Sequence, residues 1–410
     1  MDRDGHIAVA GGGQAGGRAA QAARRAGHTG PITIFAAEPE LPYERPPLSK
    51  GVLTGKQTVA DAHLAASDSW DDEAITVRAA TPVRAIDRGA RTVTTDTGEV
   101  VGYDGLVLAT GSHALRPAWP GADLPGVRTF RTAADAHAVR DSLAAGERVV
   151  LIGGGYIGME IAAAARARGA DVTVLEAAEG VMTRQVVPEV GAWFLARHRQ
   201  RGTEIVTGAR VSGFTGERHV TGVELADGTV YPCERAVIGV GIRPATELAE
   251  AAGLTVSDGI VTDAAGRTDD PAIVAAGDCT RHWNPALGRS TRLESWDNAE
   301  RQARAAGATL AGTPTEVDAL PWFWSDQGED NLQLIGLPET WDETIVRGDP
   351  DGEAFTVLLL AEGRVVGAQA VNRGGDIAAA KRLIARGVLP PRDLLADASL
   401  PLKRALKQAG

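Results

Sequence analysis

The stretch VVLIGGGYIGMEIAA, Val149–Ala163, decides the fold that we predict for this chain. Its first four residues are apolar and predict a buried strand, and its last residues predict a helix. Between them, Gly153, Gly155 and Gly158 form a GxGxxG pattern. Glycine at these positions allows a tight turn, close approach of the backbone to a pyrophosphate, and close packing of the helix on the strand. The helix N-terminus then offers free N–H groups to the phosphates, so the stretch predicts a dinucleotide-binding turn.

The start of the chain repeats this pattern. A strand over residues 6–10 precedes Gly11, Gly13 and Gly16, and an alanine-rich helix and a strand over 32–35 follow. One GxGxxG is a weak signal, but two in the same strand–turn–helix context, 142 residues apart, are a strong one. The two copies predict two bound dinucleotides, which indicates a flavin and a nicotinamide nucleotide.

Three carboxylates lie near the ends of predicted strands. Glu176 directly follows the strand 171–175, 18 residues after the last glycine of its turn, where a carboxylate can accept hydrogen bonds from an adenosine ribose. Glu38 stands three residues beyond its strand, so a ribose contact and a surface loop are equally good interpretations. Asp278 ends a short strand, where it suits either a flavin ribityl hydroxyl or a cap for the next turn.

The segment between the two turns contains further candidates. The prolines of Leu41–Leu53 predict a stiff, extended loop that would place Arg45 and Lys50 beside the first turn. For Lys50, an ammonium near the flavin ring competes with a solvated lysine. Residues 77–108 alternate in polarity and predict an antiparallel excursion, which ends in a short strand before Thr110 and Gly111.

The composition excludes several classes of function. With 410 residues, 44% of them hydrophobic and 23% charged, the chain is typical of a globular protein of two to four domains. The net charge of −11 argues against nucleic acid and anionic membranes as partners. No apolar run reaches the roughly 18 residues of a membrane span. Because the first strand begins at His6, we expect no signal peptide and a cytoplasmic location.

The cysteines argue against further kinds of site and one class of enzyme. Cys233 and Cys279 are the only two, and they predict buried side chains with neither a metal site nor a disulfide framework. Residues 1–232 contain no cysteine. A disulfide reductase, which needs a reactive thiol beside its flavin, is therefore disfavoured.

The residue pattern of the chain changes after a polar linker at 313–318. LPWFWSDQ, Leu320–Gln327, and the alternating segments after it predict an antiparallel sheet of three to five strands, with helices from Asp376 and Leu402. The clustering of Trp322 and Trp324 usually indicates core packing, since a site role requires that they face a ring system.

Several strings together give the chain a family resemblance. They are GGGQAGG, PYERPPLSK, LATG, GGGYIGMEIAA, VTVLEAA, GVGIRP, AAGDC, RLESWDNAERQA and PWFWSDQ, and they run from Gly11 to Gln327. The chain resembles the NADH-dependent ferredoxin reductases of the putidaredoxin-reductase and rhodocoxin-reductase type. The resemblance implies an α/β fold like that of glutathione reductase. It has a discontinuous FAD domain at 1–114 and 243–316, an inserted NAD domain at 115–242, and a C-terminal α+β domain at 317–410.

The resemblance also implies roles for single residues. Lys50 is expected to pair with Glu160 at the flavin, and these two are the candidate catalytic residues. The expected FAD contacts are Gly11, Gly13, Gly16, Glu38, Arg45, Lys50, Thr110, Gly111, Asp278, Trp296 and Trp324. The expected NAD contacts are Gly153, Gly155, Tyr156, Ile157, Gly158, Glu176, Arg184, Gly241 and Glu294.

The function that the resemblance implies is transfer of a hydride from NADH to FAD, followed by single-electron transfer to a 2Fe-2S ferredoxin. That ferredoxin would supply a haem monooxygenase or a ring-hydroxylating dioxygenase. Two alternatives stay open: an NADH oxidase or quinone or small-radical reductase on the same scaffold, and a slow NADH-sensing flavoprotein. The residues from Val371 onward carry a basic excess, and Lys381, Arg382 and Arg386 share one face of a predicted helix as a candidate ferredoxin-docking patch.

Overall fold

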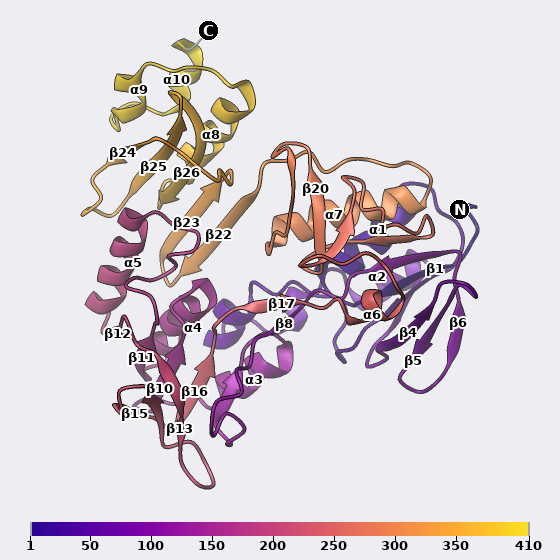
Figure 1. The fold of residues 1–410 in the computed structure, drawn as a ribbon, viewed down its shortest axis with the longest axis horizontal. Helices are drawn as coiled ribbons and strands as arrows, with labels where there is room; N and C mark the ends of the chain where they lie inside the picture. The colour runs from indigo at the N-terminus through magenta and orange to yellow at the C-terminus, as the bar shows by residue number, and fades with distance from the viewer. Residues whose placement is uncertain (1, 409–410) are drawn as a thin grey trace. The chain divides into compact units, whose positions relative to one another are not determined.

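The computed structural model describes residues 2–408, and the chain divides into two compact units. The first unit runs through Pro47, from Gln57 to His113 and from Ile242 to Ala319. The second runs from Leu48 to Lys56, from Ala114 to Gly241 and from Leu320 onward. Each unit contains a five-stranded parallel sheet that carries one of the two glycine-rich turns, which confirms the predicted α/β fold (Figure 1).

The sheet of the first unit has the strand order β19-β7-β1-β2-β3. Its central strand β1 carries four fully buried apolar or small residues, because helices or other strands cover both faces of a parallel sheet. The five strands are β1 (Ile7–Ala10), β2 (Ile32–Phe35), β3 (Ile75–Arg78), β7 (Gly105–Leu108) and β19 (Ile273–Ala275).

The antiparallel excursion predicted for residues 77–108 is shorter in the structure. Only β4 (Val83–Asp87), β5 (Thr92–Thr95) and β6 (Val100–Gly102) form an antiparallel sheet. The prediction is wrong for both ends of the range, because β3 and β7 belong to the parallel sheet. All four residues of β7 are buried, and such a continuous run is typical of an inner parallel strand.

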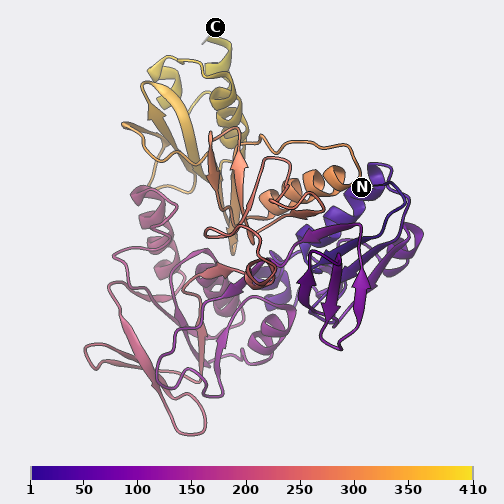
Figure 2. The ribbon, with the colours of Figure 1, turned by 45° about the vertical axis from the view of Figure 1, so that its right-hand side comes forward.

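Two helices of the first unit, α1 (Gln14–Arg25) and α7 (Trp296–Leu310), pack side by side (Figures 1 and 2). Alanine and glycine line their contact, and a Cβ added to Gly307 would lie 2.2 Å from the backbone oxygen of Ala19. Helix α7 begins two residues after the predicted Glu294, because Ser295 caps it by accepting a hydrogen bond from the Asn298 amide.

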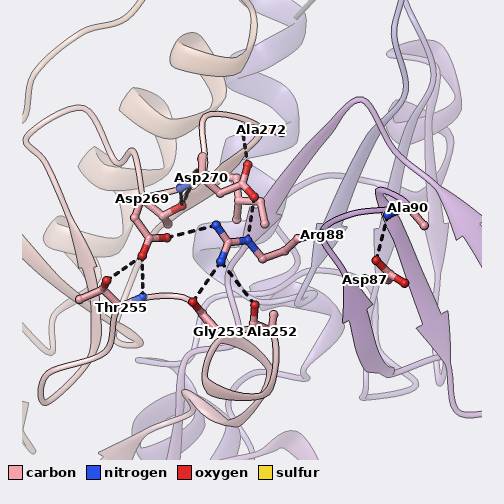
Figure 3. A network of polar contacts seen from close by, with 11 residues as sticks. Asp87, Arg88, Ala90, Ala252, Gly253, Thr255, Asp269, Asp270 and Ala272 are labelled. Atoms are coloured by element: carbon pink, nitrogen blue, oxygen red, sulfur yellow. Dashed lines mark hydrogen bonds and ion pairs between the residues drawn. The ribbon is translucent and has the colours of Figure 1, made fainter.

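A partly exposed arginine network ties the excursion to the rest of the first unit. Arg88 Nε donates to Asp270 Oδ2 at 2.8 Å, and Nη1 donates to the backbone oxygen of Gly253 at 3.0 Å (Figure 3).

The remaining elements of this unit are η2 (Ala60–Ala62), α2 (Ser67–Asp72), α6 (Glu247–Ala251), β18 (Ile260–Thr262), β20 (Thr280–Asn284) and β21 (Arg289–Thr291). Two short strands, β8 (Ser112–Ala114) and β17 (Ile242–Pro244), pair where the chain passes between the units.

The parallel sheet of the second unit has the order β12-β11-β10-β16-β9. Its strands are β9 (Val127–Thr129), β10 (Arg148–Ile152), β11 (Asp171–Leu175), β12 (Glu204–Val206) and β16 (Arg235–Ile238). The helices are α3 (Ala133–Asp141), α4 (Tyr156–Ala167) and α5 (Pro188–Gln200), and β13 (Val211–Thr215), β14 (Gly222–Leu225) and β15 (Val230–Pro232) form an antiparallel excursion. The π-helix η1 (Leu48–Val52), from the predicted stiff loop, packs against α3 and α4.

The C-terminal part of the second unit is a five-stranded antiparallel sheet, as predicted, with α8 packed on it (Figure 2). In spatial order its strands are β22 (Trp322–Gln327), β23 (Asp330–Ile335), β26 (Arg364–Val371), β25 (Phe355–Ala361) and β24 (Glu343–Gly348). The helices are α8 (Gly374–Arg386), α9 (Arg392–Ala396) and α10 (Lys403–Gln408). Among the described residues, no helix is both long and apolar enough to cross a membrane.

Candidate active site

The two glycine-rich turns have the same geometry. The first glycine of each, Gly11 and Gly153, has a positive φ (127° and 106°), which favours glycine. A Cβ on the third glycine would lie 1.8 Å from the Gly11 oxygen in one turn and 2.1 Å from the Gly153 oxygen in the other. At the second glycine, Gly13 or Gly155, an added Cβ meets no atom within 4 Å. Each turn thus has one open side next to a helix N-terminus, which fits a pyrophosphate.

Glu176 lies at the end of β11, as predicted, and its carboxylate is held by the backbone. Oε2 accepts a hydrogen bond from the Gly154 amide at 2.5 Å, and Oε1 accepts one from the Ala178 amide at 2.8 Å. Each oxygen keeps a lone pair for a ribose hydroxyl. The exposed Arg184 lies instead near Gly241, since its Nη1 would be 3.7 Å from a Cβ there. Glu176 follows β11, whereas Gly241 lies three residues after β16, on the other side of β10.

Glu38 forms a small cluster in the first unit. Its Oε2 accepts from the Tyr43 hydroxyl at 2.7 Å, and its Oε1 accepts from Arg45 Nη2 at 2.8 Å. The proline-rich segment therefore supplies two donors that fix a carboxylate three residues beyond its strand. A carboxylate held by two such partners has a fixed position, which fits a ribose contact better than a loose surface loop. The ribose contact itself stays a prediction.

Asp278 also has a defined environment. Ser112 Oγ donates to Asp278 Oδ2 at 3.1 Å, and the preceding residue, Gly277, donates its amide to the buried Gln302 Oε1 at 2.7 Å. Thr110 Oγ1 donates to the backbone oxygen of Ala245 at 2.6 Å, next to Gly111, whose φ is 70°. These contacts fix the loop ends at the carboxyl edge of the first parallel sheet, where such sheets bind ligands.

The predicted ion pair between Lys50 and Glu160 is present in the second unit. Lys50 Nζ lies 2.8 Å from Glu160 Oε2, with the lysine side chain 22% exposed and the glutamate 3% exposed. Two serines complete the site: Ser49 Oγ donates to Oε2 at 2.5 Å, and Ser325 Oγ donates to Oε1 at 2.7 Å. A buried carboxylate is stable only with such partners.

The strand β22 faces α4 through alternate residues. Two residues along a strand span about 6.6 Å and four residues along a helix about 6 Å, so the two repeats match. Phe323 accordingly packs on Tyr156, with ring centroids 4.4 Å apart, and Ser325 reaches Glu160. Burial raises the pKa of Tyr156, so its hydroxyl stays neutral.

Other predicted contacts are placed as follows. Trp324 stacks on Trp322 with centroids 5.0 Å apart, and Ile157, in the first turn of α4, is 45% exposed. Glu294 and Trp296 belong to the first unit, at the start of α7, and Glu294 pairs with Arg292. The assignment of all these residues to a cofactor stays a prediction.

Sequence reasoning missed the serines and their neighbours. Ser49, Ser325 and Gln327 lie in the strings PYERPPLSK and PWFWSDQ but were assigned no role, and Met182 lies in none of the quoted strings, although the alternation of polar residues in WSDQ is a usable signal. Both cysteines are buried and unpaired, and burial raises the pKa of the Cys233 thiol to about 12. Neither has the lowered pKa of a reactive thiol.

Comparisons with known proteins agree with this geometry. Residues 5–303 match the pyridine nucleotide-disulphide oxidoreductase family, and residues 322–406 match a reductase C-terminal domain. The chain is 43% identical to the ferredoxin–NAD(+) reductase component of an anthranilate 1,2-dioxygenase system from Burkholderia cepacia, covering 97% of this chain and 98% of that protein. It is 38% identical to putidaredoxin reductase from Pseudomonas putida, covering 100% and 98%.

A solved structure, the covalent putidaredoxin reductase–putidaredoxin complex, matches with a TM-score of 0.95 and 37% identity, covering 100% of this chain and 99% of that one. The chain belongs to the pyridine nucleotide-disulphide oxidoreductase family, among the ferredoxin–NAD(+) reductases.

Proposed function

We propose that this chain is an NADH-dependent ferredoxin reductase that serves a haem monooxygenase or a ring-hydroxylating dioxygenase through a 2Fe-2S ferredoxin. The observation that carries the proposal is a pair of glycine-rich turns of equal geometry in one chain, each with an open side at its second glycine. Full-length similarity to ferredoxin reductases supports it. Two dinucleotides fit the two turns, and we assign FAD to the first and NADH to the second.

Bound FAD would accept a hydride from NADH and release the electrons singly, which needs no side-chain acid or base. The chain's own residues bind and orient. Glu38, with Arg45 held beside it, would fix the FAD ribose end, and Asp278 would contact the ribityl–pyrophosphate region. Lys50 would stabilise negative charge on the reduced ring, and Glu160 with its two serines would hold the Lys50 ammonium in place.

NADH is the proposed donor rather than NADPH. The carboxylate of Glu176 would accept from ribose hydroxyls and repel a 2′-phosphate. Arg184, the nearby cation that could reverse this preference, lies beside Gly241. Comparable kcat/KM values for NADH and NADPH would contradict the assignment.

The deciding experiment is NADH-driven reduction of cytochrome c by the FAD-loaded protein, with and without a panel of 2Fe-2S ferredoxins. We expect cytochrome c reduction only when a ferredoxin is present. Rapid oxygen or quinone consumption without ferredoxin would instead assign an oxidase or quinone reductase. An air-stable reduced flavin with NADH-dependent dimerisation would assign a redox sensor.

The ferredoxin is proposed to dock on α8. Lys381, Arg382 and Arg386 are all exposed there, while the chain as a whole carries a net charge of −11. An acidic ferredoxin therefore needs a local basic patch, which raises the association rate more than the affinity.

Reversing Lys381 and Arg382 to glutamate should raise the KM for ferredoxin and weaken its salt dependence, with flavin reduction by NADH unchanged. Reversing the exposed Arg84 and Arg91 changes the net charge equally on the excursion sheet and is the matched control. If the Lys381 and Arg382 variant keeps the wild-type KM at low salt, or if the Arg84 and Arg91 control raises the KM equally, α8 is not the docking site.

We also propose a cytoplasmic location. Two buried, unpaired cysteines suit a reducing compartment. Fractionation of the source cells would test this, and enrichment in a membrane or extracellular fraction would contradict it.

A further inference from the structure

The second unit contains a closed ring of contacts that joins the Glu160 carboxylate to the second glycine-rich turn. The ring leaves the turn along α4 to Glu160 and returns through Ser325, Gln327 and Met182 to Gly154. Every member belongs to the same compact unit. The contacts of Ser325, Gln327 and Met182 belong neither to the glycine motif nor to the ion pair.

The ring begins at a carboxylate with no free orientation. Lys50 and Ser49 both bind Oε2 of Glu160, and among residues 2–408 the hydrogen-bond partner of Oε1 is Ser325. Ser325 is fully buried, so removal of its hydroxyl takes a donor from a site that is closed to bulk solvent. The rotation of the Glu160 carboxylate therefore depends on one hydroxyl from β22.

The amide of Gln327 continues the ring. Gln327 and Ser325 are two residues apart on β22 and project to the same face. The Nε2 atom of Gln327 lies 3.4 Å from Ser325 Oγ and donates to Met182 Sδ at 3.3 Å. Its Oε1 lies 2.8 Å from Nε2 of the buried His198, whose pKa is lowered mainly by burial. In the tautomer with the proton on Nε2, His198 donates to Oε1 of Gln327, which leaves the Nε2 end of the amide directed to Met182.

Met182 closes the ring at the glycine-rich turn. Its amide donates to the backbone oxygen of Gly154 at 2.9 Å, and the Gly154 amide in turn donates to Glu176. Met182 has a φ of 55°, a left-handed conformation that is strained for a non-glycine residue and persists only where its surroundings impose it. The backbone oxygen of Met182 also accepts hydrogen bonds from the Gln185 and Val186 amides, at 3.1 and 3.2 Å, so its surroundings are this turn together with the contacts to Gly154 and Gln327.

We propose that Ser325, Gln327 and Met182 form a positioning chain that couples occupation of the second glycine-rich turn by a nicotinamide dinucleotide to the orientation of the Lys50–Glu160 pair. A closed ring pre-organises the turn, so a break anywhere in the ring adds an ordering cost to dinucleotide binding. Coupling is reciprocal, so the dinucleotide must also favour the Glu160 orientation that the ring holds. The inference rests on the proposed function, since it assigns the second turn to NADH.

The test is calorimetric titration of the oxidised, FAD-loaded protein with NAD⁺, which requires no turnover. Ser325→Ala and Met182→Leu should each raise the Kd for NAD⁺ by about three- to tenfold, a range typical of coupled neighbours. Together they should raise it by no more than the larger single change, because both open the same ring. Ser325→Thr, which keeps the hydroxyl, should restore most of the affinity.

Ser212→Ala is the matched control. It removes one serine hydroxyl bond from another strand of the same unit, where Ser212 Oγ donates to the Glu224 backbone oxygen at 3.2 Å. A residue with only a structural role would lower the unfolding temperature without changing the Kd for NAD⁺. If Ser325→Ala does not retain FAD, Met182→Leu, which preserves side-chain size, decides the question by the same titration.

The outcomes separate the two levels of inference. If the wild-type protein binds no NAD⁺, the proposed function itself fails. If the wild-type binds NAD⁺ and the ring variants match the Ser212→Ala control, or if their effects on the Kd simply multiply, the positioning chain is refuted and the proposed function stands.

Discussion

Removing the charge of Lys50 should destabilise the protein, because the buried Glu160 carboxylate loses its ion-pair partner. Breaking a buried ion pair on one side costs about 3–5 kcal/mol. Two observations bring the value for Lys50→Met to the bottom of this range or below it: the lysine side chain is 22% exposed, and Ser49 and Ser325 go on donating to Glu160. Hydrogen bonds to a charged group contribute about 1.5–3 kcal/mol each, so we expect a loss of about 2–3 kcal/mol.

The double variant Lys50→Met, Glu160→Gln should be less damaging than the sum of its parts. Glutamine keeps an acceptor for the serine hydroxyls and brings no charge. We expect a coupling energy of about 2 kcal/mol from urea unfolding of the four FAD-loaded proteins followed by circular dichroism.

The matched control for this cycle is the exposed pair Arg148 and Glu234, with side chains 51% and 40% exposed. Exposed pairs typically contribute about 0.2–1 kcal/mol. A coupling energy between Lys50 and Glu160 no larger than that of the control pair would refute the reasoning, since it would show that burial does not strengthen their interaction.

Three further predictions concern other parts of the chain. Arg347 is fully buried and binds Asp376 and several backbone oxygens between residues 394 and 400, so Arg347→Met should cost about 3–5 kcal/mol in urea unfolding and expose that segment to proteolysis, whereas the control Arg364→Met should cost under about 1 kcal/mol. Burial lowers the pKa of His282 from 6.5 to about 4, so the unfolded chain takes up a proton at a higher pH than the folded chain. The free energy of unfolding should therefore decrease by up to about 3 kcal/mol as the pH falls from 6.5 to 4. His282→Asn should flatten this part of the stability–pH curve, and an unchanged curve would contradict the assignment. Glu176→Ala should narrow the ratio of kcat/KM for NADH over NADPH, and an unchanged ratio would remove Glu176 from the ribose site.

The parts of the site that sequence could predict are those fixed by local geometry. The glycines of both turns and Glu176 stand at set distances from a strand, so spacing alone locates them. Glu38 was ambiguous because its partners Tyr43 and Arg45 come from a loop whose path spacing does not specify. The error over residues 77–108 has a similar origin, since alternation does not tell which parallel neighbour a short strand will find.

The ion pair came from family resemblance, and its supporting residues came from neither source. Ser325 reaches Glu160 across 165 residues of sequence, and Gln327 reaches Met182 across 145. Such contacts depend on β22 packing against α4, which no pattern within either element determines. A polar residue buried on a strand face is the one local sign that a distant polar partner exists.

The strand β22 also explains why clustering of aromatic residues could not separate core from site. Alternation sends Trp322 and Trp324 to one face, where they stack, and sends Phe323, Ser325 and Gln327 to the other. The sequence places all five within six positions, yet the contacts of Phe323 with Tyr156 and of Ser325 with Glu160 come from the second face. The surroundings of a residue in this strand therefore depend on whether its position is odd or even, and neighbours in sequence there pack against different parts of the unit.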